Sequence, residues 1–246
     1  MEVNMKFESP APRIQRILES VTSTSSGTSA KDAWSKALGV PKPNHAKLLI
    51  KIGEFMETTE ALKNQMNELF NDLAPQTDAW YEKVKEGFDK IDLTTSISNF
   101  QIRYGKNDNL YLKVIATCMN FHSHPELDIE LLTEARESLN NLTEEVIASE
   151  LDPKVKSYIT KSLRKIISAL EDYQISGTIP VVEAIETMMG HAFVDPEYRE
   201  AVNSTFGRKI IDTLGAVADL VSINAGIQPE VLKQLGQDAI KFLIDG

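Results

Sequence analysis

The densest group of residues that could do chemistry is Cys118, His122 and His124, which two acidic residues follow closely. Thiolate, imidazole and carboxylate groups bind zinc, so this group is a candidate for a metal-dependent enzyme site. A structural zinc site uses four ligands, however, and the chain has no second cysteine. Cys118 and His122 are one helical turn apart, whereas Pro125 ends any helix at His124. We expect no metal and no other cofactor here, and interpret the group as a buried cysteine with two histidines at a helix C-terminus.

No other catalytic pattern stands out in the sequence. It contains neither a nucleophile elbow nor a glycine-rich phosphate loop. Carboxylates recur at helical spacing, as in Glu130 with Glu134 and Glu183 with Glu186. A bundle-type di-iron site also needs Glu-x-x-His, which the chain lacks, so these pairs are typical of a solvated helix face. We predict no catalytic residue and favour a protein that is not an enzyme.

A basic segment follows an acidic one in the middle of the chain. Residues 126–152 carry nine acids and only Arg136, whereas residues 153–165 carry five lysines and arginines and no acid. The helix face over 154–165 could bind nucleic acid, but the neighbouring acidic residues largely cancel its positive electrostatic potential. We therefore expect the two segments to pair with each other, and nucleic-acid binding is a disfavoured alternative.

Composition bounds the class of protein. The chain has 246 residues, a formal net charge of −10 and one cysteine, which excludes an intramolecular disulfide. The apolar stretch 210–227 contains Asp212 and Asp219, each costing about 2.5 to 3.5 kcal/mol at a bilayer centre. The first residues lack the apolar core of a secretory signal. We expect a soluble, cytoplasmic protein without a membrane span.

Apolar residues recur every three or four positions along most of the chain, which predicts an all-α protein. We expect a bundle of about eight or nine helices, in one compact body or two lobes. Its centre should be an antiparallel hairpin, in which Asp152 caps a helix that begins at Pro153. Leu139 and Leu163 should lie in the seam between the two hairpin helices.

Two segments suggest contacts with another molecule. An amphipathic element with Ile14, Ile17 and Leu18 precedes the polar run 22–29, which has nothing to bury and is typical of a flexible linker. This element either binds a partner as an arm or rests on its own domain. Phe100, Ile102 and Tyr104 alternate with polar residues, which leaves a loop, a distorted helix or an edge strand open for 93–109.

The predicted organisation has three parts: an arm and linker over residues 1–29, a helical region over 30–105, and an acidic helical region over 106–246. The first part and the irregular segment supply the predicted partner-binding residues, which are Ile14, Ile17, Leu18, Phe100 and Tyr104. Because all the excess negative charge lies after residue 125, we expect a basic protein partner or self-association.

The leading functional hypothesis is a protein-interaction module. It could serve as a scaffold, an inhibitor or an accessory subunit, and a bacterial defence or toxin-neutralising system is one setting for such a protein. The two competing classes are a metal-dependent enzyme that uses Cys118, His122 and His124, and a protein that binds nucleic acid through the face over 154–165.

Overall fold

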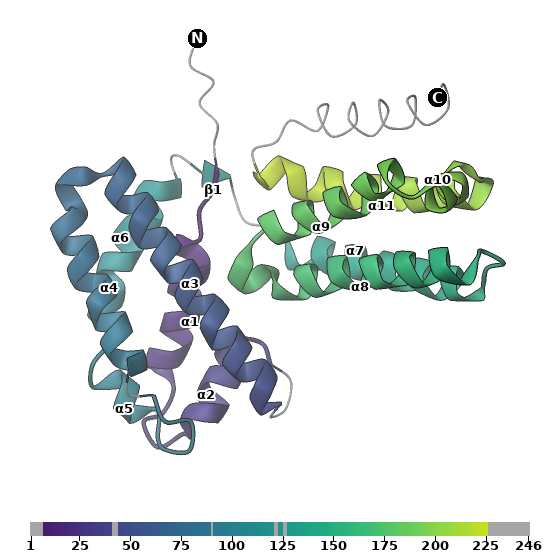
Figure 1. Cartoon of the computed structure of the whole chain (residues 1–246). Coiled ribbons are helices and arrows are strands. Elements are labelled where there is room, and N and C mark those ends of the chain that lie inside the picture. The colour runs from purple at the N-terminus through teal and green to yellow at the C-terminus, as the bar shows by residue number, and fades with distance from the viewer. Residues whose placement is uncertain (1–6, 41–43, 90, 121–122, 125–126, 226–246) are drawn as a thin grey trace, which may run out of the picture. The chain divides into compact units, whose positions relative to one another are not determined.

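A computed structural model describes residues 7–40, 44–89, 91–120, 123–124 and 127–225 (Figure 1). The predicted all-α class is confirmed, with eleven α-helices in these residues rather than eight or nine. The helix number differs because the chain has very short helices. A segment of four to eight residues shows too little periodicity to be recognised reliably as a separate helix from the sequence. Among the described residues, no helix is long and apolar enough to cross a membrane.

The elements run in the following order. The first half contains β1 (Phe7–Glu8), α1 (Ala11–Ser23), α2 (Ala30–Ala37), α3 (His45–Leu69), η1 (Asn71–Leu73), α4 (Ala74–Asp89), α5 (Ser98–Gln101) and α6 (Asp108–Asn120). The second half contains β2 (Ser123–His124), α7 (Ile129–Ala148), α8 (Pro153–Ser176), α9 (Ile179–Gly190), η2 (His191–Phe193), α10 (Pro196–Asn203) and α11 (Thr205–Ala225). The two-residue strands β1 and β2 pair with each other.

The chain forms two compact units. The N-terminal unit comprises residues 9–123 with 174–176, and the C-terminal unit comprises the rest. The division therefore follows α6, whereas the sequence suggested a boundary between 105 and 106. Leu112, Ile115 and Met119 explain the difference, because they bury α6 in the core of the N-terminal unit.

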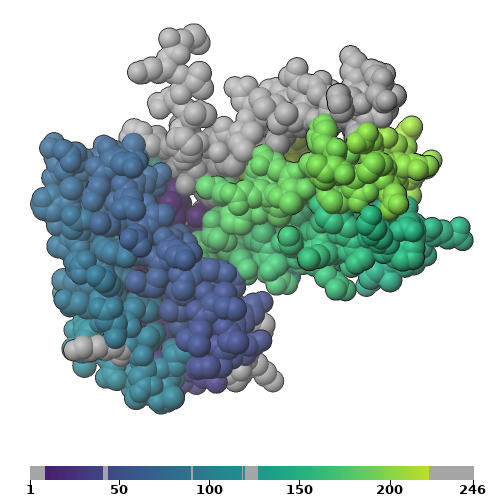
Figure 2. Space-filling view, in the orientation of Figure 1, coloured from purple at the N-terminus to yellow at the C-terminus, as the bar shows by residue number. Residues whose placement is uncertain are grey.

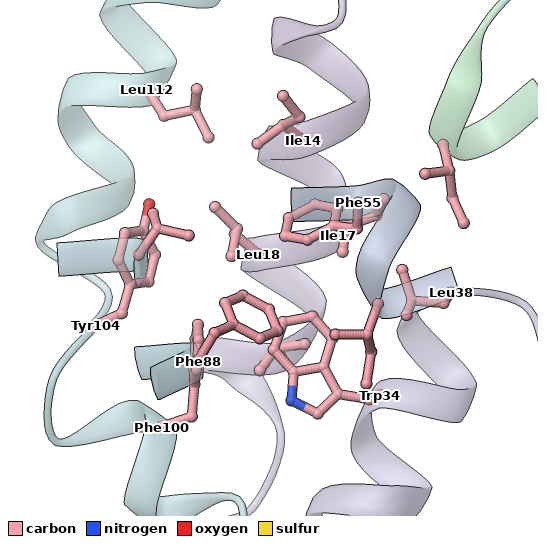
Figure 3. Close-up of a cluster of buried hydrophobic side chains, with 14 of the residues drawn as sticks. Ile14, Ile17, Leu18, Trp34, Leu38, Phe55, Phe88, Phe100, Tyr104 and Leu112 are labelled. Atoms are coloured by element: carbon pink, nitrogen blue, oxygen red, sulfur yellow. The ribbon is translucent and has the colours of Figure 1, made fainter. Parts of the chain in front are cut away.

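Helix α1 is part of that core and is not a free arm. Ile14, Ile17 and Leu18 are buried together with an aromatic cluster from α2, α3, α4 and α5. On the face shown in Figure 2, little of the purple N-terminal segment is visible beside the blue helices. The close-up in Figure 3 shows these side chains directed at one another, with α1 in the middle of the group.

The aromatic cluster is built around Trp34. Its ring lies 4.7 Å from Phe88 and 5.1 Å from Phe100, the latter edge-on at 89°. Such tilted and edge-on pairs stabilise a core by about 0.5 to 1.5 kcal/mol beyond the area they bury. Trp80 donates its indole N–H to the hydroxyl of Tyr104 at 3.0 Å, and burial raises the pKa of Tyr104, which stays neutral.

The polar run 22–29 is held in place, so the expectation of a flexible linker is wrong. The side-chain amide of Gln101 donates to the carbonyls of Val21 and Thr24 at 3.0 and 2.8 Å. The side chain of Asn109 donates to the hydroxyl of Thr22 at 2.8 Å. The run buries little apolar surface, but distant polar residues bind its backbone.

The irregular segment 93–109 contains the short helix α5 and several turns. Phe100 and Tyr104 are buried, whereas Ile102 between them is 79% exposed. The two aromatic rings, four residues apart, therefore face inward by helical spacing rather than by strand alternation. The alternatives for this segment were a loop, a distorted helix and an edge strand. The structure shows a short helix with turns and no strand in residues 93–109.

The C-terminal unit is a four-helix arrangement of α7, α8, α9 and α11. Each helix contributes to one buried core, as Leu139, Leu163, Ile185 and Leu214 illustrate. In Figure 1, α7 and α8 lie side by side and α9 and α11 form the other layer, with α10 beside α11. Helix α11 packs on both α7 and α9, which closes the arrangement.

Helices α7 and α8 form the predicted hairpin, and Asp152 caps α8 as expected. The side chain of Asp152 accepts a hydrogen bond from Lys154 N–H at 2.8 Å, and Pro153 occupies the first turn of α8. At the opposite end, the N–H of Leu127 donates to the hydroxyl of Tyr173 at 2.8 Å. Because the start of α7 meets the end of α8, the two helices are antiparallel.

Candidate partner-binding tip

The residues predicted to bind a partner do not form a surface. Ile14, Ile17, Leu18, Phe100 and Tyr104 all lie in the core of the N-terminal unit, each no more than 4% exposed. An amphipathic stripe shows that one face of a helix is buried, and here the chain itself provides the burying partner. We therefore correct that prediction and look for exposed groups elsewhere.

The predicted metal candidates lie outside what the structure describes. His122 is not among the described residues, nor are the side chains of Cys118 and His124. Within the described part of the chain, no group of three or more His, Cys, Asp or Glu residues could hold a metal ion. The metal hypothesis stays a prediction.

The C-terminal unit presents two adjacent apolar side chains to solvent. Phe193 is 50% exposed and Val194 is 75% exposed, at the turn between η2 and α10. We call this pair the Phe193–Val194 tip. Single exposed apolar residues are ordinary on protein surfaces, whereas an adjacent aromatic and aliphatic pair on a fixed turn resembles a binding anchor.

Three aromatic rings pack against one another beside the turn. Tyr158 of α8 lies 3.7 Å from His191, centroid to centroid, with their planes 18° apart. The ring centroid of Tyr198 in α10 lies 5.2 Å from each of the other two centroids. Its plane is inclined by 77° to that of Tyr158 and by 64° to that of His191. Its buried hydroxyl donates to the carbonyl of Met188 at 3.1 Å, and burial raises the pKa of Tyr198, so it acts as a neutral donor.

Asp195 fixes the start of α10 on the other side of the tip. Its carboxylate accepts hydrogen bonds from the N–H groups of Glu197 and Tyr198 at 3.1 and 3.2 Å. The hydrogen bond from the N–H of Tyr198 is the largest cause of a lowered Asp195 pKa, and the nearby side chains of Lys154 and His191 act in the same direction. The carboxylate Oδ2 lies 3.3 Å from His191 Nε2.

Arg199 holds the backbone of the tip itself. Its Nε donates to the carbonyl of Ala192 at 2.9 Å, and its Nη2 donates to the carbonyl of Phe193 at 3.3 Å. The N–H of Val194 donates to the carbonyl of His191 at 3.1 Å. These bonds hold the backbone of the turn, and its two apolar side chains are exposed.

A histidine beside an aspartate also invites a catalytic interpretation. In acid–base or nucleophilic catalysis the histidine must reach a hydroxyl, a thiol or a substrate atom. Among the described residues, no serine, threonine or cysteine side chain hydrogen-bonds to His191, and Asp195 is engaged as a helix cap. The arrangement therefore positions a turn, and we assign it no catalytic role.

The predicted nucleic-acid face divides into two parts. Lys154 lies 3.5 Å from the carboxylate of Glu197 and 3.9 Å from that of Asp195. Lys161, Arg164 and Lys165 are exposed on α8 and form no ion pair with any described residue. The basic face thus keeps three cations available, and the fourth faces carboxylates of α10.

The tip was not predicted from the sequence. An apolar pair at the end of a helix is usually interpreted as core, and nothing local marks Phe193 and Val194 as exposed. The ring stack joins residues more than thirty positions apart, so spacing alone does not reveal it. Comparisons of the chain with protein-family models, curated proteins and solved structures gave no significant match.

Proposed function

We propose that this chain is a protein-interaction module that binds another protein through the Phe193–Val194 tip. The observation that carries the proposal is the exposure of both side chains on a turn whose backbone is held by Arg199. Interfaces draw most of their affinity from a few apolar or aromatic anchors that enter pockets on the partner. An anchor fixed before binding loses less conformational entropy when the complex forms.

The charges near the tip define the partner's chemistry. Glu186 on α9 and Glu197 and Glu200 on α10 are exposed on the helices that flank it. The second half of the chain also carries the whole net negative charge. A partner with an apolar pocket and a basic rim fits best, since opposite rim charges accelerate association while the apolar anchor provides affinity.

Such a module suits a scaffold, an inhibitor or an accessory subunit, including one from a bacterial defence or toxin-neutralising system. The competing nucleic-acid hypothesis has one observation in its favour, the three available cations Lys161, Arg164 and Lys165. It predicts binding that weakens steeply with salt and that charge reversal at these positions abolishes. The metal-enzyme hypothesis predicts stoichiometric metal in the purified protein, lost on replacing His122 and His124.

The tip is tested by a double substitution with a matched control. Phe193→Ala with Val194→Ser removes the anchor, and Ile102→Ser removes a comparably exposed apolar side chain from the other unit. Each variant is used to capture proteins from its native cells, with quantitative mass spectrometry of the captured set. We expect at least one protein to fall about tenfold with the tip variant and to be retained by Ile102→Ser. Identical sets from the tip variant and the wild type would refute the proposal.

A further inference from the structure

The hairpin of the C-terminal unit carries opposite charges on its two helices, facing away from the core. On α7, Glu130, Glu134, Glu137 and Glu144 are exposed and recur at helical spacing, opposite the buried stripe that includes Leu139. On α8, Lys161, Arg164 and Lys165 are exposed in the same way. We call these sets the α7 acidic stripe and the α8 basic stripe.

Neither stripe is neutralised within the described chain. The sequence led us to expect pairing between the two hairpin helices, but Lys156 instead donates to the carbonyls of Ile147 and Ser149 at the end of α7. Ion pairs of this unit include Glu145 with Lys209, and Lys154 with Glu197 and Asp195. No member of either stripe forms an ion pair with a described residue.

The spacing of the two stripes is complementary. Glu137 and Glu134 are three residues apart, and Lys161 and Arg164 are three residues apart in the opposite chain direction. An antiparallel pair of helices would therefore bring the charges level. Within the hairpin, the hydrogen bond between Leu127 and Tyr173 shows which residues of α7 and α8 lie at the same height along the helix axes. Glu137 lies about 15 Å along α7 from Leu127, and Lys161 lies about 18 Å along α8 from Tyr173.

We propose that the α8 basic stripe of one copy binds the α7 acidic stripe of a second copy of this chain. A second copy set beside the first, without rotation or shift along the helices, places its α7 antiparallel to the first copy's α8. Glu137 then lies level with Lys161, and Glu134 lies level with Arg164. The spacing match and the absence of internal partners favour a second copy as the occupant.

This contact is heterologous, because each copy uses a different surface. Heterologous contacts leave one stripe open at each end, so association continues beyond the dimer unless the copies close into a ring. The interface is mostly charged, and exposed ion pairs are individually weak and screened by salt. Association should therefore depend on protein concentration and decrease with added salt.

The test uses charge exchange in the full chain, measured by sedimentation velocity. Glu134→Lys, Glu137→Lys and Glu144→Lys reverse the acidic stripe, and Lys161→Glu, Arg164→Glu and Lys165→Glu reverse the basic stripe. Each triple variant should lose self-association, and mixing the two should restore it. The sextuple variant keeps the net charge of −10 and should associate like the wild type. Circular dichroism checks that each variant is folded.

The wild type should show species larger than the monomer at about 100 µM protein in about 50 mM salt, and lose them in about 0.5 M salt. A wild type that stays monomeric in both conditions would overturn the inference. Equal association of both triple variants and the wild type would also overturn it. None of these variants changes the tip, so partner capture through Phe193 and Val194 can succeed or fail independently.

Discussion

Tyr158 and His191 stack with their ring centroids 3.7 Å apart, which joins the N-terminal part of α8 to the turn that carries the exposed tip. Tyr158 also reaches the carbonyl of Thr187 with its hydroxyl, at 3.4 Å. The hydroxyl thus contacts the last part of α9, and the ring contacts η2, which follows it directly. This ring contact and the hydrogen bonds of Arg199 both hold the turn that carries the tip.

The first prediction separates the ring from the hydroxyl. Tyr158→Ala should lower the free energy of unfolding by about 1 to 3 kcal/mol, because it removes the ring that His191 and Tyr198 contact. Tyr158→Phe keeps the ring and should cost less than about 1 kcal/mol, since the hydroxyl bond is long and exposed. Urea unfolding measures both. Equal losses in the two variants would show that the stack contributes nothing.

The second prediction concerns acid stability. The pKa of Asp195 is lowered in the folded chain, so its carboxylate stabilises the fold above its ordinary pKa of 3.8. That stabilisation is lost as the pH falls through the lowered pKa. Asp195→Asn keeps a good N-cap but removes the charge, so its Tm should fall less steeply with pH below about 4.

The matched control for Asp195 is Asp212→Asn on α11, an exposed carboxylate without an ion pair in the described chain. Its Tm against pH should run parallel to that of the wild type. Should Asp195→Asn also run parallel, the charge at the start of α10 would play no part in acid stability.

The third prediction tests the hairpin seam. Leu139→Ala and Leu163→Ala should each cost about 2 to 5 kcal/mol, because both side chains are fully buried and their removal leaves a cavity. Ile147→Ala on the exposed side of α7 should cost less than about 1 kcal/mol. Losses below about half a kilocalorie at both leucines, measured by urea unfolding, would contradict the observed packing.

The fourth prediction concerns residues 22–29. Limited proteolysis of the wild type should spare this segment, because Gln101 and Asn109 bind its backbone and side chains. Gln101→Ala leaves the carbonyls of Val21 and Thr24 without that donor and should speed cleavage there severalfold. Gln76→Ala, at an exposed position on α4, is the control. Rapid cleavage of the wild type between 22 and 29 would restore the flexible-linker interpretation.

Local signals in the sequence were sufficient for the all-α class and for the hairpin of α7 and α8. Asp152 and Pro153 mark a helix start by their own backbone chemistry, and Leu139 and Leu163 mark a buried face by spacing alone. The same spacing at Ile14 and Leu18 predicted a buried face correctly but did not show what buries it. The covering residues come from helices far along the chain.

Long-range contacts explain the remaining differences. Gln101 holds a polar run some eighty positions earlier, so that run looked free in the sequence. The exposure of Phe193 and Val194 likewise depends on where the chain turns after α9 and on Arg199, which follows them. Both features become visible only when the backbone path is known.

Photo-crosslinking tests most directly whether the Phe193–Val194 tip contacts another protein. Phe193 is replaced by benzoylphenylalanine in the full chain, and Ile102 is replaced in the same way as the control. After irradiation in the native cells, position 193 should give a covalent adduct with one protein that position 102 does not give. An adduct pattern that is the same from both positions, or no adduct from position 193, would contradict the account.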